Sequence, residues 1–306
     1  MATNTGSLTP LDVTRAPEGG EIGPIQSGWR LAVREFASNR LAVTGVAILL
    51  FFVVFCFFGP LFYHANLLQT DLINAHDPPG AGHPLGTDTQ GFDVLGELMK
   101  GGQAALEIGF FAAFVAITIG SAVGAVAGLA GGLVDSALMR ITDVFLSVPF
   151  LFVVLILAIR YGASVLSLSL VIGAFSWTVP ARLVRAEVLT IRERDFVAAA
   201  RTAGSGKGRL IGRHLLPNAF GVVVVNVTFQ VADAILAVAY VGFLGFGLHY
   251  PNVDWGDMLS SGTTYITDGY WWLIYPVGIC IVLTVMALNF IGDALRDSMD
   301  VRLRRR

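Results

Sequence analysis

The sequence has 306 residues, of which 55% are hydrophobic and only 14% are charged, and its formal net charge is −2. Soluble domains carry about 25% charged residues, so this composition excludes an ordinary soluble protein and indicates a membrane protein. The mean hydropathy of +0.70 agrees with that assignment. The near-neutral charge gives no sign of a nucleic-acid partner, and none is expected.

Residues 1–40 form a polar N-terminal segment that is rich in Gly and Pro up to about Ser27. An amphipathic helix is predicted in its second half, where apolar Trp29, Leu31, Ala32, Val33 and Phe36 alternate with Arg30, Arg34, Glu35 and Arg40. A signal peptide would place a short apolar core soon after the start. Here the first apolar run begins forty residues in and is long enough to span, so we interpret it as a retained anchor.

Six apolar runs follow, each close to the roughly 20 residues that cross a hydrocarbon core of about 30 Å. They are Leu41–Tyr63, Ile108–Val134, Val144–Ile159, Tyr161–Ala181, Leu215–Val253 and Gly269–Gly292. We therefore predict an all-α integral membrane protein with six transmembrane helices. Residues 41–63 form the first helix, 64–103 an extracytoplasmic loop, 104–294 a core of five spans, and 295–306 a basic cytoplasmic tail.

The direction of the spans follows from the distribution of Lys and Arg, which favour cytoplasmic loops. In the six-span arrangement every Lys and Arg except Lys100 and Arg160 falls on one side. Both termini are therefore predicted to be cytoplasmic, in a plasma or inner membrane.

The opposite side is acidic, with Asp71, Asp77, Asp88, Asp93 and Glu97 in the first loop and Asp254, Asp257 and Asp268 in the last. A cation site is one interpretation, but acidic residues are simply permitted there, and we favour that second reading. The five histidines show no metal-ligand spacing, and no nucleophile–base arrangement suggests an enzyme. No metal site and no catalytic residue are predicted.

The second span carries glycine at every fourth position, at Gly120, Gly124 and Gly128. Small residues at this spacing let two helix backbones approach closely, so we interpret the stripe as a packing surface and not as a binding site.

The connection between the fourth and fifth predicted spans, residues 192–217, is basic and regular. A short helix is predicted from Asp195 through three alanines to Gly204, which can end it. Such a helix could push on a soluble partner or contact anionic lipid, and its chemistry favours neither. The run around Lys207 is not a phosphate-binding loop, because the required first glycine is replaced by Arg201 and Gly208 stands in place of Ser or Thr.

This connection resembles the EAA loop of ABC importer permeases, whose pattern is Glu-Ala-Ala, three residues, Gly, and later Leu-Pro. Ala199, Ala200, Gly204, Leu216 and Pro217 match it, while Ala198 stands where the family has Glu. Four further blocks resemble the C-type permease subunits of the dipeptide, oligopeptide and nickel importer family. These blocks are Phe36–Gly45, Pro84–Leu95, Gly242–Leu259 and Asn289–Asp297, and Phe92 replaces the usual Arg in the second.

The resemblance implies a type I ABC importer permease fold with a cytoplasmic coupling helix, and a chain without catalytic activity of its own. It implies four kinds of partner: a homologous second permease, two ATP-binding subunits or domains that hold ATP and Mg, an extracytoplasmic solute-binding protein, and membrane lipid. The residues implied to contact the ATPase are Asp195, Ala199, Ala200, Gly204, Leu216 and Pro217. Peptides are the expected solute, with nickel or another small solute as the alternative.

Asp233 is the one acidic residue that we place deep inside a predicted span. It either lines the translocation path or forms a helix–helix hydrogen bond that involves Asn226 or Gln230. An ion-coupled secondary transporter would favour paired ionisable groups and inverted repeats, and an intramembrane enzyme would need a catalytic cluster. We find neither pattern in the sequence.

Overall fold

The structure is a computed structural model, and it describes residues 28–304. Predictions for residues 1–27 and 305–306 lie outside the described residues. Between residues 28 and 304 every regular element is helical, apart from one isolated bridge between Thr87 and Asp93. The predicted all-α fold is confirmed.

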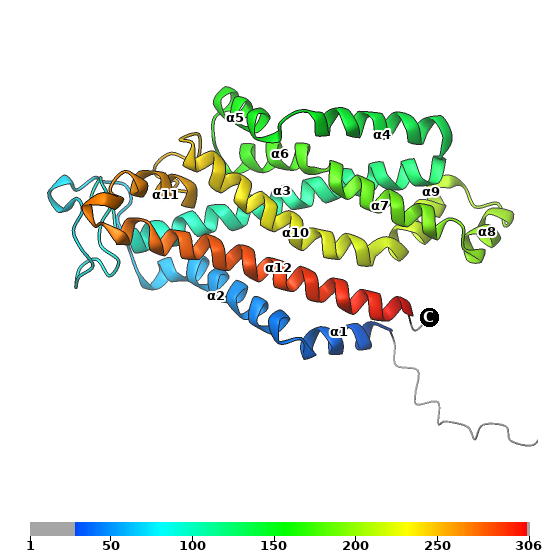
Figure 1. The fold of residues 1–306 in the computed structure, drawn as a ribbon, viewed down its shortest axis with the longest axis horizontal. Coiled ribbons are helices and arrows are strands. Elements are labelled where there is room, and N and C mark those ends of the chain that lie inside the picture. The colour runs from blue at the N-terminus through cyan, green and yellow to red at the C-terminus, as the bar shows by residue number, and fades with distance from the viewer. Residues whose placement is uncertain (1–27, 305–306) are drawn as a thin grey trace, which may run out of the picture.

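Most helices lie side by side along one long axis (Figure 1). The α-helices are α1 Gly28–Ser38, α2 Arg40–Phe62, α3 Val94–Ala130, α4 Gly132–Ser147, α5 Phe150–Tyr161, α6 Val165–Ser176, α7 Thr178–Ile191, α8 Asp195–Thr202, α9 Lys207–Leu210, α10 Leu216–Phe243, α11 Trp255–Thr263 and α12 Tyr275–Arg304. Short 3-10 turns cover Leu72–Asn74, Ile266–Asp268 and Trp271–Leu273, and a π-helical turn, Ile211–Leu215, joins α9 to α10.

Four helices, α2, α3, α10 and α12, are each long and apolar enough to cross a membrane. Two bent pairs, α4 with α5 and α6 with α7, meet the same condition when each pair is taken as one span. The described residues therefore supply up to six spans, in agreement with the predicted number.

The two bends have chemical causes in proline. The α4–α5 pair bends by 77° at Pro149, whose ring cannot continue a helix from α4. The α6–α7 pair bends by 43°. There Pro180 has no N–H to offer the carbonyl of Ser176 four residues earlier, and that carbonyl instead accepts a hydrogen bond from Gln230 Nε2 at 3.3 Å.

The bent pairs also change the predicted third and fourth spans. The third span was predicted at residues 144–159. The structure instead begins this pair of helices at Gly132 and ends it at Tyr161, and the bend falls inside the predicted run. The fourth was predicted at 161–181, but α7 continues to Ile191. Arg182 and Arg185 therefore lie on a helix and not in a connecting loop.

The second span begins at Val94 and not at Ile108, so residues 94–103 are helical and not part of the loop. The Asp93 side chain starts this helix by accepting a hydrogen bond from the Gly96 amide at 2.8 Å. The fifth span ends at Phe243, ten residues before the predicted end, and α12 continues through the predicted tail to Arg304.

The predicted glycine stripe is the contact surface between α3 and α7. A Cβ at Gly120 would lie 2.7 Å from the carbonyl oxygen of Trp177, and one at Gly124 would lie 2.9 Å from the amide nitrogen of Arg185. These contacts are with backbone atoms, so only glycine permits this approach. The packing interpretation of the stripe is confirmed.

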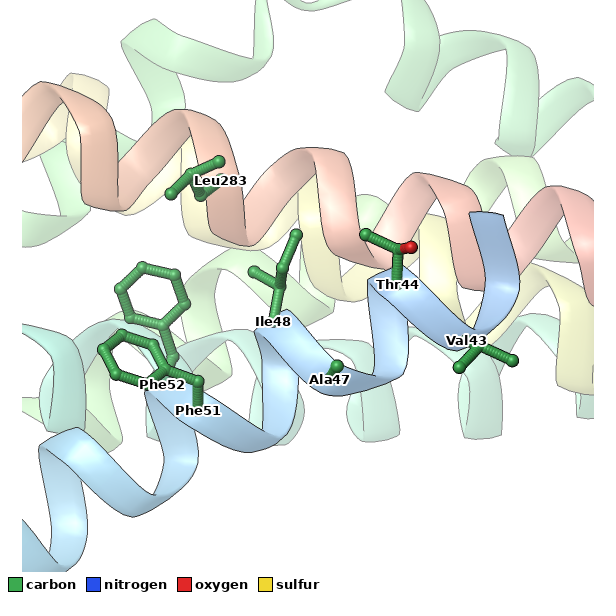
Figure 2. Close-up of a pocket in the computed structure, with 7 residues that line it drawn as sticks. All are labelled: Val43, Thr44, Ala47, Ile48, Phe51, Phe52 and Leu283. Carbon is green, nitrogen blue, oxygen red and sulfur yellow. The ribbon is translucent and has the colours of Figure 1, made fainter. Parts of the chain in front are cut away.

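An apolar groove of about 410 Å³ runs between α2 and α12 (Figure 2). Its lining residues are Val43, Thr44, Ala47, Ile48, Phe51, Phe52 and Leu283. Its one hydroxyl, on Thr44, already donates to the Arg40 carbonyl at 2.9 Å. The side chains that line the groove therefore offer no free hydrogen-bond donor to a solute.

The two ends of the bundle differ in structure (Figure 1). One end holds α8, α9 and the C-terminus of α12, and we call it the basic end because residues 192–213 contribute six Lys and Arg there: Arg192, Arg194, Arg201, Lys207, Arg209 and Arg213. The other end holds the loop of residues 63–93 together with α11, and we call it the acidic end.

Candidate functional site

The segment α8–α9 projects at the basic end as a compact helical unit (Figure 1). Asp195 begins α8, where a carboxylate interacts favourably with the helix dipole. Val197 is fully buried, whereas Ala199 is exposed and Ala200 is half-buried. The helix thus has an inner face that packs on the bundle and an outer face that is open.

Gly204 ends α8 in the left-handed conformation that the sequence suggested, with φ of 80°. The amide of Ser205 donates to the carbonyl of Ala200 at 3.1 Å, and that of Ala203 donates to Ala199 at 3.0 Å. The first of these is the 6→1 hydrogen bond of a Schellman-type C-cap, whereas the second continues the α-helix.

A buried cluster fixes this segment to three long helices. Its members are Ala125 on α3, Val184, Val188 and Ile191 on α7, Val197 on α8, Leu210 on α9, Leu215 in the π-helical turn and Ala219 on α10. Ala200 and Leu216 pack against its edge. A displacement of α8 therefore acts on α3, α7 and α10 together, because close-packed side chains transmit strain.

Among the six residues of the predicted coupling set, Ala200 and Leu216 meet in this cluster. Asp195, Ala199 and Gly204 are exposed on α8 and its C-terminal turn. Pro217 is exposed in the first turn of α10. The structure therefore divides the set into an anchoring part and an outward-facing part, which sequence spacing did not distinguish.

Three arginines that the sequence analysis treated only as positive charge have specific partners. Arg185 binds Asp135 on α4 through two contacts of 2.5 and 2.6 Å, and Arg182 binds Asp143 at 2.5 Å. Arg192 donates to the carbonyl of Gly128 on α3 at 2.8 Å. These contacts tie α7 to α4 and α3 next to the projecting segment.

A polar stripe follows one face of α10. Asn226, Asp233 and Tyr240 recur at intervals of seven residues, which is about two helical turns or 10 Å along the axis. The Asp233 side chain is exposed, and Tyr240 is 56% exposed. In Figure 1, α10 runs between α12 and α7.

The hydrogen bonds of this stripe differ from the predicted alternative. Gln230 donates to Ser176 and not to Asp233, and Asn226 Oδ1 is buried without a partner. Among the described residues the Asp233 carboxylate forms neither a hydrogen bond nor an ion pair. A carboxylate in this state inside a span requires water or another chain.

Glu107 is a second carboxylate inside a span, and sequence reasoning missed it. The predicted span began at Ile108, whereas α3 begins at Val94 and places Glu107 well inside the helix. The charges of Glu97, Lys100 and Glu107 obscured the start of the span in the hydropathy pattern. The capping residue Asp93 was the local signal that could have revealed it.

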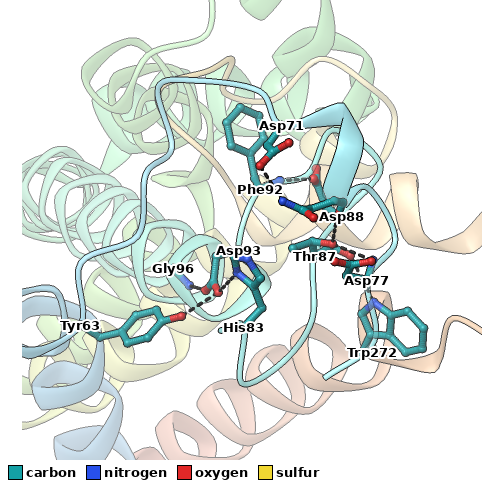
Figure 3. A network of polar contacts seen from close by, with 11 residues as sticks. Tyr63, Asp71, Asp77, His83, Thr87, Asp88, Phe92, Asp93, Gly96 and Trp272 are labelled. Carbon is teal, nitrogen blue, oxygen red and sulfur yellow. Dashed lines mark hydrogen bonds and ion pairs between the residues drawn. The ribbon is translucent and has the colours of Figure 1, made fainter. Parts of the chain in front are cut away.

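At the acidic end, carboxylates hold the loop in place (Figure 3). Asp93 accepts hydrogen bonds from Tyr63 at 2.7 Å and from Gly96, and it contacts His83 Nδ1 at 2.8 Å. Asp88 accepts from the backbone amides of Gln90 and Phe92 at 2.8 and 2.7 Å. In the described part of the chain no group of three or more His, Cys, Asp or Glu is arranged to hold a metal ion.

Asp254 fixes the second loop of the acidic end. It is fully buried and accepts hydrogen bonds from the amides of Leu248 at 2.7 Å and Asp257 at 2.9 Å. Burial raises the pKa of Asp254 to about 6, although the backbone hydrogen bonds lower it. Burial also raises the pKa values of Asp88 and Asp257.

We expect the stability of the folded chain to fall as pH rises through 6. A folded-state pKa above the unfolded value of about 3.9 gives a contribution that is complete below pH 4 and is lost as the pH rises through 6. For Asp254 this amounts to at most about 3 kcal/mol. The measurement is the melting temperature of the purified protein between pH 5 and 7.5. The melting temperature should fall less steeply with pH in Asp254→Asn. An unchanged dependence on pH would contradict the raised pKa of Asp254 as its cause.

Together these features define a class of protein. It is a polytopic helical membrane protein in which a helical segment at one end, α8–α9, packs against α3, α7 and α10. Residues 120–305 match the family of binding-protein-dependent transport system inner membrane components, and residues 27–79 match the N-terminal transmembrane domain of oligopeptide transport permease C. The chain belongs to this family of transport permeases, as the sequence resemblance predicted. Its fold is that of a type I ABC permease.

Curated relatives cover nearly the whole chain. It is 36% identical to the dipeptide transport system permease protein DppC of Bacillus subtilis, over 92% of this chain and 86% of that protein. It is 35% identical to the oligopeptide transport system permease protein OppC of Haemophilus influenzae, over 90% and 89%. It is 36% identical to a putative peptide permease protein of Brucella suis, over 95% and 97%.

Proposed function

We propose that this chain is one transmembrane permease subunit of an ATP-driven, binding-protein-dependent importer of di- or oligopeptides. The family supports the class of transporter, and the names of the relatives support the peptide substrate. The observation that carries the mechanism is the rooting of α8 and α9 in α3, α7 and α10. Nickel or another small solute is the alternative cargo.

The proposed assembly contains a homologous second permease, two ATP-binding subunits or domains, and an extracytoplasmic solute-binding protein, all within a plasma or inner membrane. ATP and Mg bind to the partner subunits, which carry out hydrolysis. The exposed face of α8 around Ala199 docks on an ATPase, and Ala200 and Leu216 transmit the movement inward. Alternating access follows when this movement shifts the three helices together.

The translocation path is proposed to run along the polar face of α10. Along this face Asp233 and Tyr240 are exposed and Asn226 is half-buried. Isolated polar groups facing lipid would be costly, so a water-filled path between this chain and the second permease is their favourable environment. The groove between α2 and α12 is apolar and does not compete for a polar solute.

The proposed orientation places the basic end in the cytoplasm. Single cysteines introduced by Thr89→Cys and Thr263→Cys should react with an impermeant thiol reagent on intact cells, because both positions lie at the acidic end. Ser205→Cys should react only after the membrane is opened. Labelling of Ser205→Cys on intact cells would reverse the orientation.

The function is tested in proteoliposomes that contain the chain with its partner subunits. Uptake of a radiolabelled tripeptide should require ATP and the binding protein, and it should persist when ionophores collapse all ion gradients. Uptake that follows a gradient without ATP would identify a secondary transporter. ATP-dependent uptake of nickel ions without peptide uptake would establish the alternative cargo.

A further inference from the structure

We propose that Asp233 is a specificity-determining residue of the path, and that its carboxylate binds the positively charged α-ammonium group of a peptide in transit. This inference rests on the proposed function. It adds a chemical selection step within the permease itself, separate from the selection made by a binding protein.

The charge on this face is isolated. Asp233 is the only charged residue of α10, and α6 and residues 275–292 of α12, which pack on α10, carry none. The helix α7 also packs on α10 and carries Glu187 and two arginines, Arg182 and Arg185, which are paired with Asp143 and Asp135 of α4. Within the described chain the Asp233 carboxylate has no hydrogen-bond or ion-pair partner. A charge inside a span is costly unless water or an opposite charge accompanies it, so a cation from outside the chain would stabilise this exposed carboxylate.

The direction of the side chain follows from the packing of α10 on α3. A Cβ at Gly109 of α3 would lie 2.8 Å from Ile235 and 3.4 Å from Val231, so those two residues face α3. Asp233 lies two residues from each of them, which places it on the opposite side of the helix. The carboxylate therefore points away from the chain's own core.

The neighbours on the stripe fit a peptide backbone. Asn226 and Tyr240 stand about 10 Å on either side of Asp233 and carry neutral hydrogen-bonding groups. Asn226 is half-buried, and its Oδ1 is buried and has no partner within the described residues. One fixed anion between neutral polar groups suits a solute that has one ammonium group and several amides.

Glu107 offers a matched control. It is also a carboxylate inside a span, but it lies two residues from Gly109 and so on the side of α3 that faces away from α10. Glu107 and Asp233 therefore lie on opposite sides of the α3–α10 pair. Removing the charge at Glu107 should leave the path on α10 unchanged.

The test attaches a charged or neutral group by chemical modification at position 233 and, as the control, at position 107. Asp233→Cys and Glu107→Cys are made in a background in which Cys56 and Cys280 are replaced by alanine, and each is reconstituted with all partner subunits. Methanethiosulfonate reagents then attach a sulfonate, a trimethylammonium or a methyl group to the introduced thiol. The readout is ATP-dependent uptake of the tripeptide, together with the labelling rate during turnover.

We expect uptake by Asp233→Cys to fall about tenfold or more, because the variant loses a charge-assisted hydrogen bond to the peptide. The variant should still co-purify with its partners. The sulfonate should restore uptake, whereas the methyl and trimethylammonium groups should not. The tripeptide with its binding protein and ATP should slow labelling. Glu107→Cys should keep normal uptake with all three reagents.

Several results would overturn the proposal: full uptake by unlabelled Asp233→Cys, rescue by the methyl group, or no labelling. Loss of co-purification would instead assign Asp233 to pairing with the second permease. These outcomes are separate from a failure of the proposed function, in which the unsubstituted Cys-free assembly itself imports no peptide.

Discussion

A glutamate at Ala199 is expected to abolish uptake while the membrane domain stays folded. Ala199 is exposed on the outer face of α8, and the anchoring residue Val197 points the other way. A docked ATPase would have to cover the new carboxylate without a partner for it, at a cost of about 3–5 kcal/mol. This corresponds to a loss of ATPase association of a hundredfold or more. The measurements are co-purification of the ATPase and tripeptide uptake.

Neighbouring substitutions sharpen this test. Ala199→Ser changes little in size or charge and should behave as the unsubstituted chain. Ala200→Glu should also abolish uptake, but it places the charge against the buried cluster and should lower stability as well. Gly204→Val should disturb the C-cap, because φ at this position is 80°. If Ala199→Glu retains both the ATPases and full uptake, α8 is not the coupling helix. Contact with anionic lipid would then be the favoured interpretation of this segment.

Replacement of Gly124 by leucine is expected to have the largest effect on folding. Even its Cβ would overlap the carbonyl oxygen of Ala181 and lie 2.9 Å from the amide nitrogen of Arg185. Backbone atoms cannot move aside as a flexible side chain can, so α3 and α7 must separate. Overpacking of this kind costs about 1–3 kcal/mol or more. The measurements are the melting temperature and the yield of monodisperse protein in detergent.

Gly278 on α12 provides the control, since a Cβ there would meet no other atom within 4 Å. Gly278→Ala should therefore keep or slightly raise the melting temperature, because alanine favours helix by up to about 1 kcal/mol. Gly124→Ala should already lower it. Equal melting temperatures for the two alanine variants would show that the α3–α7 contact is not close in the folded protein.

Local signals in the sequence were sufficient for several features. Long apolar runs predicted the spans, because a helix is the way an isolated segment satisfies its backbone in a bilayer. The glycine repeat predicted a close helix contact, which the structure places between α3 and α7. The pattern from Asp195 to Gly204 predicted a short helix with a glycine end, and α8 has both.

Boundaries were less predictable where distant residues decide them. The first turns of α3 contain the charged residue Glu97, which is buried because Tyr250, far along the chain, donates a hydrogen bond to it. Hydropathy counts such a residue as a break in the span. Likewise, the carbonyl that Pro180 leaves free is satisfied by Gln230 on another helix, so the bend of the α6–α7 pair depends on a contact between segments.

The sequence by itself determined the helical class, the family and the short helix between the fourth and fifth spans, since these depend on composition and on neighbours along the chain. Only the tertiary structure decided which face each residue occupies. It directs Ala199 outward and Ala200 toward the core, and it separates Asp233 from Glu107 on opposite sides of a helix pair. The physical reason is that the face a helix buries depends on which helices pack against it, and those helices are distant in sequence.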